Sequence, residues 1–563
     1  MQITIKQISS LEKVRIFDSL PENELTHKKV FGGERFSYQI AVKNAERAVA
    51  VLAISAASDL LPYIKLYRVV QSAMDYPVYP FCEDEDYITK EPGLMPDMLL
   101  PLCEQDNLLA VGSGMCASIW VTVDIPRGFA AGEYDITLQL QRKLMSPASQ
   151  DSFSDICSMH LVVLPASLPE QELIYTQWFH TDCIAQAHGA EVYSDTHWDM
   201  IDKYIAAAAY VGINMLLMPV ITPPLDTAYQ TERMNVQLTK ITRHSGKYQF
   251  DFTRVRRWIA LCKKHGIRYF EISHLFSQWG AAFSPNIYAE TERGTERVFG
   301  WDVKSDDPSY ISFLQAFVPQ LVAVLKEEGV AERTYFHISD EPNMEQIDAY
   351  QRALHIIKPL IEGFKTLDAL SDIAFYRQGL VRCPVTASNH IAPFLEENAE
   401  EQWVYYCCGQ YEKVSNRFLA MPSYRNRIMG LQMYRYNMKG FLQWGFNFYN
   451  VCCSVYPLQP YLSSGADGAF PSGDSFSVYP GKDEPYLSLR ALVFYEGLQD
   501  MDVCRMLERY IGRAAVVCMM EEQANMPLTF ENYPRSSEFL LTLRERMTDE
   551  IEKHLLKIET SAE

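Results

Sequence analysis

Two adjacent carboxylates, Asp340 and Glu341, follow the apolar run TYFHIS (residues 334–339), which has the pattern of a buried strand. Like charges repel, and carboxyl pairs whose surroundings displace their pKa values are typical of acid and base catalysts. Pro342 ends the predicted strand at once, so the pair is fixed on a turn. The alternative is a helix N-terminus, where acidic residues are favoured electrostatically. The position directly after an apolar strand favours a catalytic pair.

Other predicted strands also end in polar and aromatic residues. The candidate substrate-binding residues are Trp178, His180, His274, Asp368, Asn389, Tyr405, Tyr406, Gln443, Trp444 and Asn447. For about half of them the alternative is a buried, satisfied hydrogen bond in the core, since buried polar groups are normally paired. Together they predict a wide polar pocket with aromatic walls, which suits a sugar.

The elements that must position these residues alternate between helix and strand. Gly212, Gly266 and Gly329 each end a predicted helix and precede a predicted strand. The eight predicted strands cover residues 175–180, 214–219, 268–273, 334–339, 364–369, 384–389, 403–408 and 441–446. Eight such units predict a (β/α)8 barrel, whose catalytic groups lie at the C-terminal ends of the strands. A doubly wound open sheet is the alternative, weakened because no glycine-rich phosphate-binding turn follows a strand.

The chain is too long for one hydrophobic core, so several domains are expected. Short alternating strands up to residue 168 predict a β-sandwich domain over 1–168. We expect the catalytic barrel over 169–510 and a C-terminal helical extension, packed on the barrel, over 511–563. A helix is predicted to begin at a cap on Thr196, and Pro319 predicts a kink or break in a later helix.

The composition limits the partners and the compartment. A net charge of -20 argues against nucleic acid and anionic membranes as partners. No signal peptide or membrane-spanning run is visible, and the 13 cysteines lack CxxC spacing, so we expect free thiols and a cytoplasmic location. The His, Asp and Cys residues lack metal-binding spacing, and no phosphate-binding or serine-nucleophile motif is present, so no metal and no cofactor are expected.

Three segments carry a resemblance to a known family. They are HISDEP (337–342), FLQWGFNFYN (441–450) and GDSFSVYPGKDEPYLSLRALVFYEGLQDMD (473–502). With the expected sandwich and barrel, they resemble the domain-of-unknown-function family 4091, which is similar to glycoside hydrolase family 123, the β-N-acetylgalactosaminidases. The resemblance covers residues 170–510 best. It implies a glycosidase acting on an oligosaccharide or glycoconjugate.

The resemblance also implies a mechanism in which the 2-acetamido group of the sugar is the nucleophile. Asp340 would then stabilise the oxazolinium intermediate, and Glu341 would be the general acid and base, giving a retaining enzyme. A second hypothesis is a conventional glycosidase for a sugar without the acetamide, with Glu341 as acid and Glu271 or Asp368 as nucleophile. A third is a sugar-binding barrel without activity.

Overall fold

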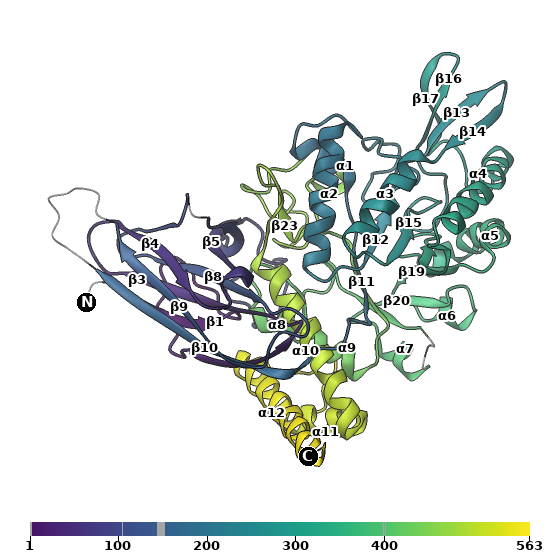
Figure 1. The fold of residues 1–563 in the computed structure, drawn as a ribbon. Coiled ribbons are helices and arrows are strands. Elements are labelled where there is room, and N and C mark those ends of the chain that lie inside the picture. The colour runs from purple at the N-terminus through teal and green to yellow at the C-terminus, as the bar shows by residue number, and fades with distance from the viewer. Residues whose placement is uncertain (1–2, 104, 144–152, 398, 400, 563) are drawn as a thin grey trace. The chain divides into compact units, whose positions relative to one another are not determined.

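The structure is a computed structural model that describes residues 3–103, 105–143, 153–397, 399 and 401–562. The chain folds into two compact units (Figure 1). The first unit contains residues 1–171, 411–435 and 486–563, and the second contains residues 172–410 and 436–485. The chain therefore enters the first unit three times.

The first unit holds two five-stranded sheets. One sheet has the order β1 (Ile3–Ser9), β3 (Arg35–Asn44), β8 (Cys116–Asp124), β5 (Ile64–Met74) and β6 (Gly93–Pro101). The other has the order β2 (His27–Gly32), β10 (Ser154–Ser167), β9 (Gly132–Arg142), β4 (Ala50–Ala57) and β7 (Leu108–Val111). Both sheets contribute to one hydrophobic core, for example Ile40 and Val121 from the first and Leu52 and Leu138 from the second. The strands thus direct alternate residues into a shared interior.

Helices complete the first unit. They are α8 (Ser423–Arg427), α9 (Met429–Arg435), α10 (Leu489–Ile511), α11 (Arg513–Ala524) and α12 (Ser537–Ala562). Residues 511–563 belong to this unit. Within it, α12 packs on α10, and its Arg544 pairs with Asp500 of α10 and with Glu34. The expected packing of these residues on the barrel stays a prediction. The boundaries at 168 and 510 stay predictions.

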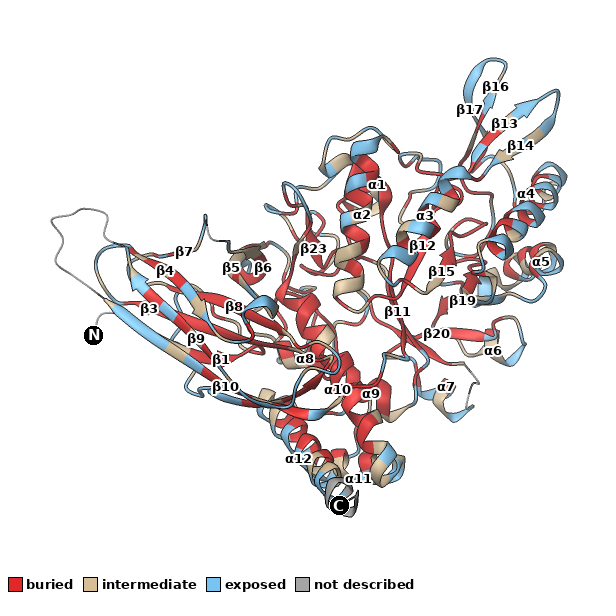
Figure 2. Ribbon diagram, in the orientation of Figure 1, coloured by how far each residue is buried: buried red, intermediate tan, exposed pale blue. Residues whose placement is uncertain are grey.

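The second unit contains a closed barrel of eight parallel strands, which confirms the predicted barrel over the open sheet. The strands are β11 (Ile174–Gln177), β12 (Met215–Met218), β15 (Tyr269–Ile272), β18 (Thr334–Phe336), β19 (Lys365–Leu370), β20 (Cys383–Ala387), β21 (Trp403–Tyr405) and β22 (Gly440–Gln443). Each of them overlaps one predicted strand. The barrel closes where β11 pairs with β22. Apolar side chains such as Leu217, Leu367 and Val385 lie in its interior, and the strands are largely buried (Figure 2).

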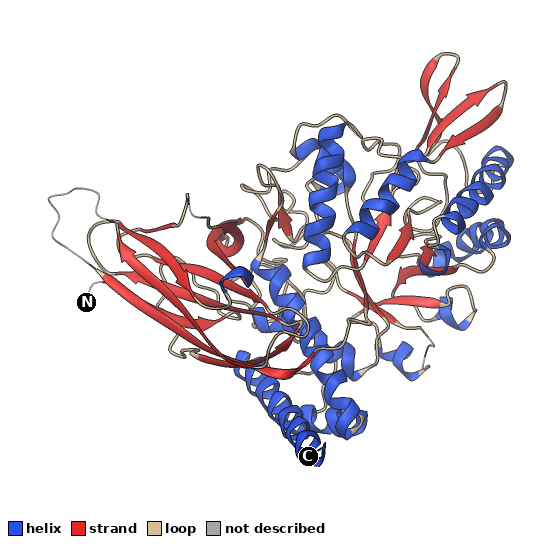
Figure 3. Ribbon diagram, viewed as in Figure 1, coloured by secondary structure: helices blue, strands red, loops and turns tan. Residues whose placement is uncertain are grey.

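Helices and short strands surround the barrel strands (Figure 3). The helices are α1 (Thr181–Ala187), α2 (Asp195–Tyr210), α3 (Thr253–Lys264), α4 (Pro308–Glu327), α5 (Ile347–Ile357), α6 (Ala374–Arg377) and α7 (Ala392–Glu396). A four-stranded sheet that we did not predict is formed by β14 (Lys247–Asp251), β13 (Lys240–His244), β16 (Ile287–Thr291) and β17 (Gly294–Phe299). The remaining short elements are β23 (Val478–Tyr479), β24 (Tyr486–Leu487) and the 3-10 helices Leu61–Tyr63, Ala331–Arg333, Met344–Gln346, Lys358–Ile361 and Cys452–Ser454.

One local prediction about helices needs correction. The cap of α2 is Ser194, whose hydroxyl accepts from the His197 N–H, so the expected cap Thr196 lies within the helix. Helix α4 continues through Pro319, so of the two expected outcomes there the break does not occur, and the kink stays a prediction. By length and composition α4 is also the one helix in the described ranges that is apolar enough to cross a membrane. Its apolar face, which includes Phe313 and Phe317, is buried in this structure.

Candidate active site

A cavity of about 110 Å³ lies within the barrel unit, at the C-terminal ends of the strands. The lining residues come mainly from strand ends and from the loops that follow them. They are Trp178, Leu225, Asp226, Gln278, Trp279, Asp340, Glu341, Ala369, Tyr405, Cys407, Cys408, Leu442, Trp444 and Phe470. This is the end of the barrel at which such folds place their catalytic groups.

Asp340 is a buried carboxylate held by a side-chain amide. Its Oδ2 accepts a hydrogen bond from Gln278 Nε2 at 2.6 Å, and 5% of the residue is exposed. Burial, together with the adjacent charge of Glu341, raises the pKa of Asp340 well above its usual value. A positive charge that appeared in the cavity would therefore strongly favour the ionised form of Asp340.

Glu341 lies on the same turn but in a different environment. It is exposed, and its Oε1 accepts a hydrogen bond from the Tyr405 hydroxyl at 2.6 Å. Its φ of 41° is in the left-handed region, which costs a residue with a side chain about 1–3 kcal/mol and is frequent at active sites. The Glu341 N–H donates to Ala369 O at 3.1 Å and fixes this turn. The two neighbouring carboxylates thus point to separate partners, one buried and one open to solvent.

A layer of charged side chains lies beneath the pair, in the barrel interior. Glu271 accepts from Trp178 Nε1 at 3.0 Å, from His337 Nε2 at 2.8 Å and from the Thr176 hydroxyl. The second ring nitrogen of His337 lies 3.4 Å from Asp368. Burial lowers the pKa of His337, but Asp368 and Glu271 outweigh burial and raise it to about 9. His337 is therefore a cation between two carboxylates at neutral pH.

Aromatic rings form one wall of the cavity. Trp444 packs against Phe470 with ring centroids 5.2 Å apart, and its Nε1 donates to Asp474 at 2.8 Å. Tyr405 and Trp178 line the same space, and Trp279 is 44% exposed at its rim. Trp279 also has a left-handed φ of 54°, and its N–H donates to Asp340 O at 3.1 Å. The wall combines ring faces with a polar floor, an arrangement suited to a sugar ring.

A family model described as the glycoside hydrolase 123 catalytic domain matches residues 178–507, which include the barrel from β12 to β22 and all the residues that line the cavity. The chain belongs to glycoside hydrolase family 123. It is accordingly a glycosidase, as the resemblance implied. No curated protein matches the sequence.

A solved structure of another family 123 enzyme has the same fold. A glycoside hydrolase from Clostridium perfringens, described in a study of glycolipid glycan hydrolysis, aligns with a TM-score of 0.75 at 16% identity and covers 100% of both chains. A β-glucuronidase from Bacteroides uniformis aligns with a TM-score of 0.30 at 10% identity, covering 80% of this chain and 47% of its own. A β-galacturonidase from Eisenbergiella tayi reaches 0.31 at 12% identity, covering 83% and 69%. The last two scores are too low to support an argument.

Three of the predicted substrate-binding residues of this family 123 hydrolase line the cavity with the carboxylate pair: Trp178, Tyr405 and Trp444. The other seven do not line it: His180, His274, Asp368, Asn389, Tyr406, Gln443 and Asn447. Most of the seven are buried and bonded to neighbouring protein groups, which is the alternative that the sequence left open for about half of the set.

The positions of these seven follow from their partners. Asn447 and His180 bond to each other through the Asn447 side chain and the His180 backbone. Gln443 bonds to Asp474, and Asp368 accepts from the Tyr350 hydroxyl and from backbone N–H groups. The remaining three show different surroundings.

Tyr406 comes directly after Tyr405, the last residue of β21, and its ring packs against Phe441. Asn389 accepts from Gln410 Nε2 at 2.9 Å. His274 stacks on His337 with centroids 4.3 Å apart, and within the described part of the chain neither of its ring nitrogens has a hydrogen-bond partner.

The prediction of the site missed several lining residues, notably Asp226, Phe470 and the adjacent pair Cys407 and Cys408. Asp226 and Phe470 lie on loops, and the strand pattern of the sequence does not predict that these loops reach the cavity. The cysteine pair forms the last two residues of the predicted strand 403–408, so its place at a strand end was a usable signal. Gln278 follows the third predicted strand and was visible in the same way.

Proposed function

We propose that this enzyme is a retaining β-N-acetylhexosaminidase, with β-N-acetylgalactosaminides as preferred substrates, in which the substrate's acetamide is the nucleophile. The observation that carries the proposal is the division of the adjacent pair into a buried Asp340 bonded to Gln278 and an exposed Glu341 bonded to Tyr405. Adjacent residues suit this chemistry because no enzyme carboxylate has to reach the opposite face of the sugar.

Each carboxylate has a distinct part in the proposed reaction. The acetamide oxygen attacks the anomeric carbon while Glu341 donates a proton to the leaving oxygen, and an oxazolinium ion forms. Asp340 accepts a hydrogen bond from the acetamide N–H and balances the positive charge. Because burial makes ionised Asp340 unfavourable in the free enzyme, its interaction with that charge is realised mainly in the transition state. Glu341 then removes a proton from the attacking water.

The surroundings of the two rival nucleophiles favour substrate assistance over a conventional double displacement. Glu271 and Asp368 do not line the cavity, and both are fully buried beneath it. Glu271 accepts three hydrogen bonds, and Asp368 is bonded by Tyr350 and Ile338. A carboxylate engaged in this way is poorly placed to attack a sugar. The presence of the Asp340–Glu341 pair also disfavours a purely sugar-binding role.

The substrate is proposed to be the glycan of a glycoconjugate. The family includes an enzyme described in terms of glycolipid glycan hydrolysis. The aromatic wall of Trp444 and Tyr405 would contact the apolar face of the sugar and the acetamide methyl group.

The rest of the chain is assigned supporting parts. We propose that the two N-terminal sheets form a β-sandwich accessory module, because they share one hydrophobic core. We propose that the C-terminal helices are an extension that stabilises this module. All the cysteines are free thiols, which supports a reducing compartment such as the cytoplasm.

The deciding experiment distinguishes the acetamide from an enzyme nucleophile. The intact protein is incubated with an activated 2-deoxy-2-fluoro glycoside and weighed by mass spectrometry, and a thiazoline analogue is tested as an inhibitor. We expect no covalent adduct, competitive inhibition by the thiazoline that is tighter than substrate binding, and a product of retained configuration. A stable sugar adduct on Glu271, Asp368, Asp226 or Asp340 would overturn the mechanism in favour of a conventional retaining glycosidase.

A further inference from the structure

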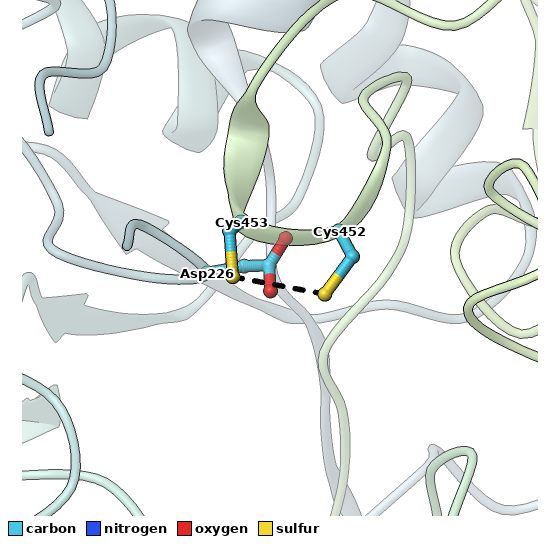
Figure 4. Close-up of side chains that lie close together, drawn as sticks. All are labelled: Asp226, Cys452 and Cys453. Atoms are coloured by element: carbon cyan, nitrogen blue, oxygen red, sulfur yellow. Dashed lines mark hydrogen bonds between the residues drawn. The ribbon is translucent and has the colours of Figure 1, made fainter. Parts of the chain in front are cut away.

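Two adjacent cysteines and a carboxylate converge beside the cavity. Cys452 and Cys453 lie in a short 3-10 turn, with sulfur atoms 3.7 Å apart. One ligand atom from each cysteine and one carboxylate oxygen of Asp226 all lie within 4.8 Å of one another. Figure 4 shows the Asp226 carboxylate directed toward the two sulfurs. Cys453 has a left-handed φ of 60°.

The backbone of Asp226 is held in place, whereas its carboxylate is incompletely bonded. The backbone N–H of Asp226 donates to Gln278 Oε1 at 2.7 Å, and its backbone carbonyl accepts from the Ser454 hydroxyl at 2.8 Å. Its Oδ2 is buried and, within the described ranges, has no hydrogen-bond partner. A buried carboxylate oxygen without a donor is an available ligand for a cation.

We propose that Asp226, Cys452 and Cys453 form a binding site for a thiophilic divalent cation of the Zn²⁺ type. Tetrahedral Zn²⁺ with Zn–S bonds of about 2.3 Å separates two thiolate sulfurs by about 3.8 Å, which matches the observed 3.7 Å. Sulfur and carboxylate oxygen in such a site are about 3.6 Å apart, so the carboxylate closes by roughly an ångström at most. Thiolates select soft or borderline metals over Mg²⁺ and Ca²⁺.

Three protein ligands leave the fourth position of a tetrahedral ion open. Asp226 is part of the cavity wall, so the ion is adjacent to the substrate site. Gln278 connects the two places, since it accepts from the Asp226 N–H and donates to Asp340. An ion that draws Asp226 toward the sulfurs therefore displaces Gln278 and reduces activity. This link to activity depends on the proposed function, whereas metal binding does not.

Binding is measured on the reduced, metal-free full-length protein by titration with Co²⁺, followed by competition with Zn²⁺. We expect one Co²⁺ per chain, with the thiolate charge-transfer absorption of a tetrahedral site. The double variant C452S/C453S should lose this absorption, and Asp226→Asn should weaken binding at least about tenfold. The matched control C103S/C518S removes two exposed thiols elsewhere and should bind like the wild type. Unchanged absorption in C452S/C453S would overturn the site.

A second measurement needs no variant. The wild-type protein is treated with a thiol-alkylating reagent with and without Zn²⁺, and the modified cysteines are identified by peptide mass spectrometry. Zn²⁺ should slow alkylation of Cys452 and Cys453 and leave that of Cys518 unchanged. Equal alkylation with and without Zn²⁺ at both positions contradicts the proposal even if the double variant does not fold.

The activity measurement separates the two proposals. Zn²⁺ should lower kcat in the wild type, a chelator should restore it, and C452S/C453S should be insensitive. Binding without any effect on kcat would overturn the link through Gln278 and leave the site itself standing. Failure of the proposed β-N-acetylhexosaminidase function would show as inactivity on 2-acetamido β-glycosides while the Co²⁺ spectrum persists.

Discussion

Asp340 lowers the stability of the protein at the pH at which it is ionised. Its folded pKa lies above its ordinary value of 3.8 because of burial and the charge of Glu341. The unfolded state therefore releases this proton more readily, and the folded state is penalised progressively as the pH rises from about 3.8 toward the folded pKa. Below the unfolded pKa the penalty is absent.

Asp340→Asn should for that reason raise the thermal midpoint while it removes activity. The gain in the free energy of unfolding should be absent near about pH 3.5 and increase up to neutral pH, by roughly 1.4 kcal/mol for each unit of pKa difference. We expect kcat to fall by about 10²–10³ with a smaller change in KM. Thermal unfolding and kinetics across this pH range test both effects. A stability gain that is independent of pH would show that the substitution acts through packing.

Glu341→Gln tests the general acid. The variant should lose about 10²–10⁴ in rate on substrates whose leaving group needs a proton, because proton transfer to the glycosidic oxygen is missing. Substrates with activated leaving groups should lose much less. The comparison of the two substrate types on one variant controls for folding. Equal losses would remove Glu341 from the acid role and direct attention to its hydrogen bond with Tyr405.

His337 has the opposite pH signature to Asp340. Its folded pKa is raised from 6.5 to about 9, so its stabilisation is complete below about pH 6.5 and is lost as the pH rises through about 9. His337→Gln leaves Glu271 and Asp368 buried without their cation and should cost about 3–5 kcal/mol near pH 6.

The cost of His337→Gln should be smaller near about pH 10, as measured by urea unfolding at both pH values. His355→Gln, at an exposed position of α5, is the control and should change little at either pH. A cost for His337→Gln that is equal at both pH values would contradict the ionic role of His337.

The packing of α8 and α9 on α10 depends on two glycines. A Cβ on Gly430 of α9 would lie 1.8 Å from the carbonyl oxygen of Gly497 in α10, and a Cβ on Gly497 would lie 2.5 Å from that of Arg427 in α8. Backbone atoms cannot give way as a flexible side chain does, so α10 would have to move away from these helices. Neither glycine has a left-handed φ, so the role of both is to let the helices approach each other closely.

Gly430→Ala should therefore destabilise the protein by about 3 kcal/mol or more, despite the higher helix propensity of alanine. Gly93→Ala is the matched control, because a Cβ there meets no atom within 4 Å and the backbone conformation is ordinary. Denaturant unfolding of both variants gives the comparison. If Gly430→Ala were as stable as the wild type, the close approach of the helices would not be required.

The sequence was most informative for elements with a clear pattern of apolar residues. All eight barrel strands were predicted because each is a short apolar run that follows a glycine, a loop or a helix stop. The sheet of β13, β14, β16 and β17 was missed, although Ser245 and Gly246 between two alternating runs are a hairpin signal. Its strands are largely exposed and lack the apolar pattern of the barrel.

The candidate site was predictable only where it lies on strand ends. Asp340 and Glu341, which line the cavity, were proposed as candidates because they directly follow the predicted strand 334–339, whose first residues form β18. His180 and Asn447 also follow strands, but their side chains are used to bind protein atoms, which sequence position does not reveal. Asp226 and Cys452 come together from distant loops, so no local spacing rule detects them.

A buried network of charges joins distant parts of the first unit. Arg544 of α12 pairs with Asp500 of α10 at 3.1 Å and with Glu34 at 2.8 Å, a partner 510 positions away in the sequence. Arg427 adds a second contact to Asp500 at 2.7 Å. Burial raises the pKa of Asp500, but Arg427 and Arg544 outweigh burial and hold it below its usual value. Asp500 thus remains ionised inside the unit.

Arg544→Met removes one cation from this network and should cost about 3–5 kcal/mol, because Asp500 and Glu34 stay buried with less compensation. Arg546→Met is the control on the same helix, since Arg546 is exposed and pairs with Glu522 at the surface, and should cost less than about 1 kcal/mol. Denaturant unfolding measures both. Equal effects of the two substitutions would show that the network contributes no more than a surface ion pair.

The chain starts in its first unit and returns to it twice, and this order has a consequence for synthesis. The two N-terminal sheets leave the ribosome first, yet α10 and α12, which complete their unit, are translated last. The hydrogen bond from Arg544 to Glu34 therefore cannot form until almost the whole polypeptide has been made. During that interval the eight barrel strands have all emerged and can pair, while the nascent N-terminal part exposes surface that would attract chaperones. In ribosome-bound chains halted before residue 537, all the barrel strands would have been made, whereas the first unit would still lack α12.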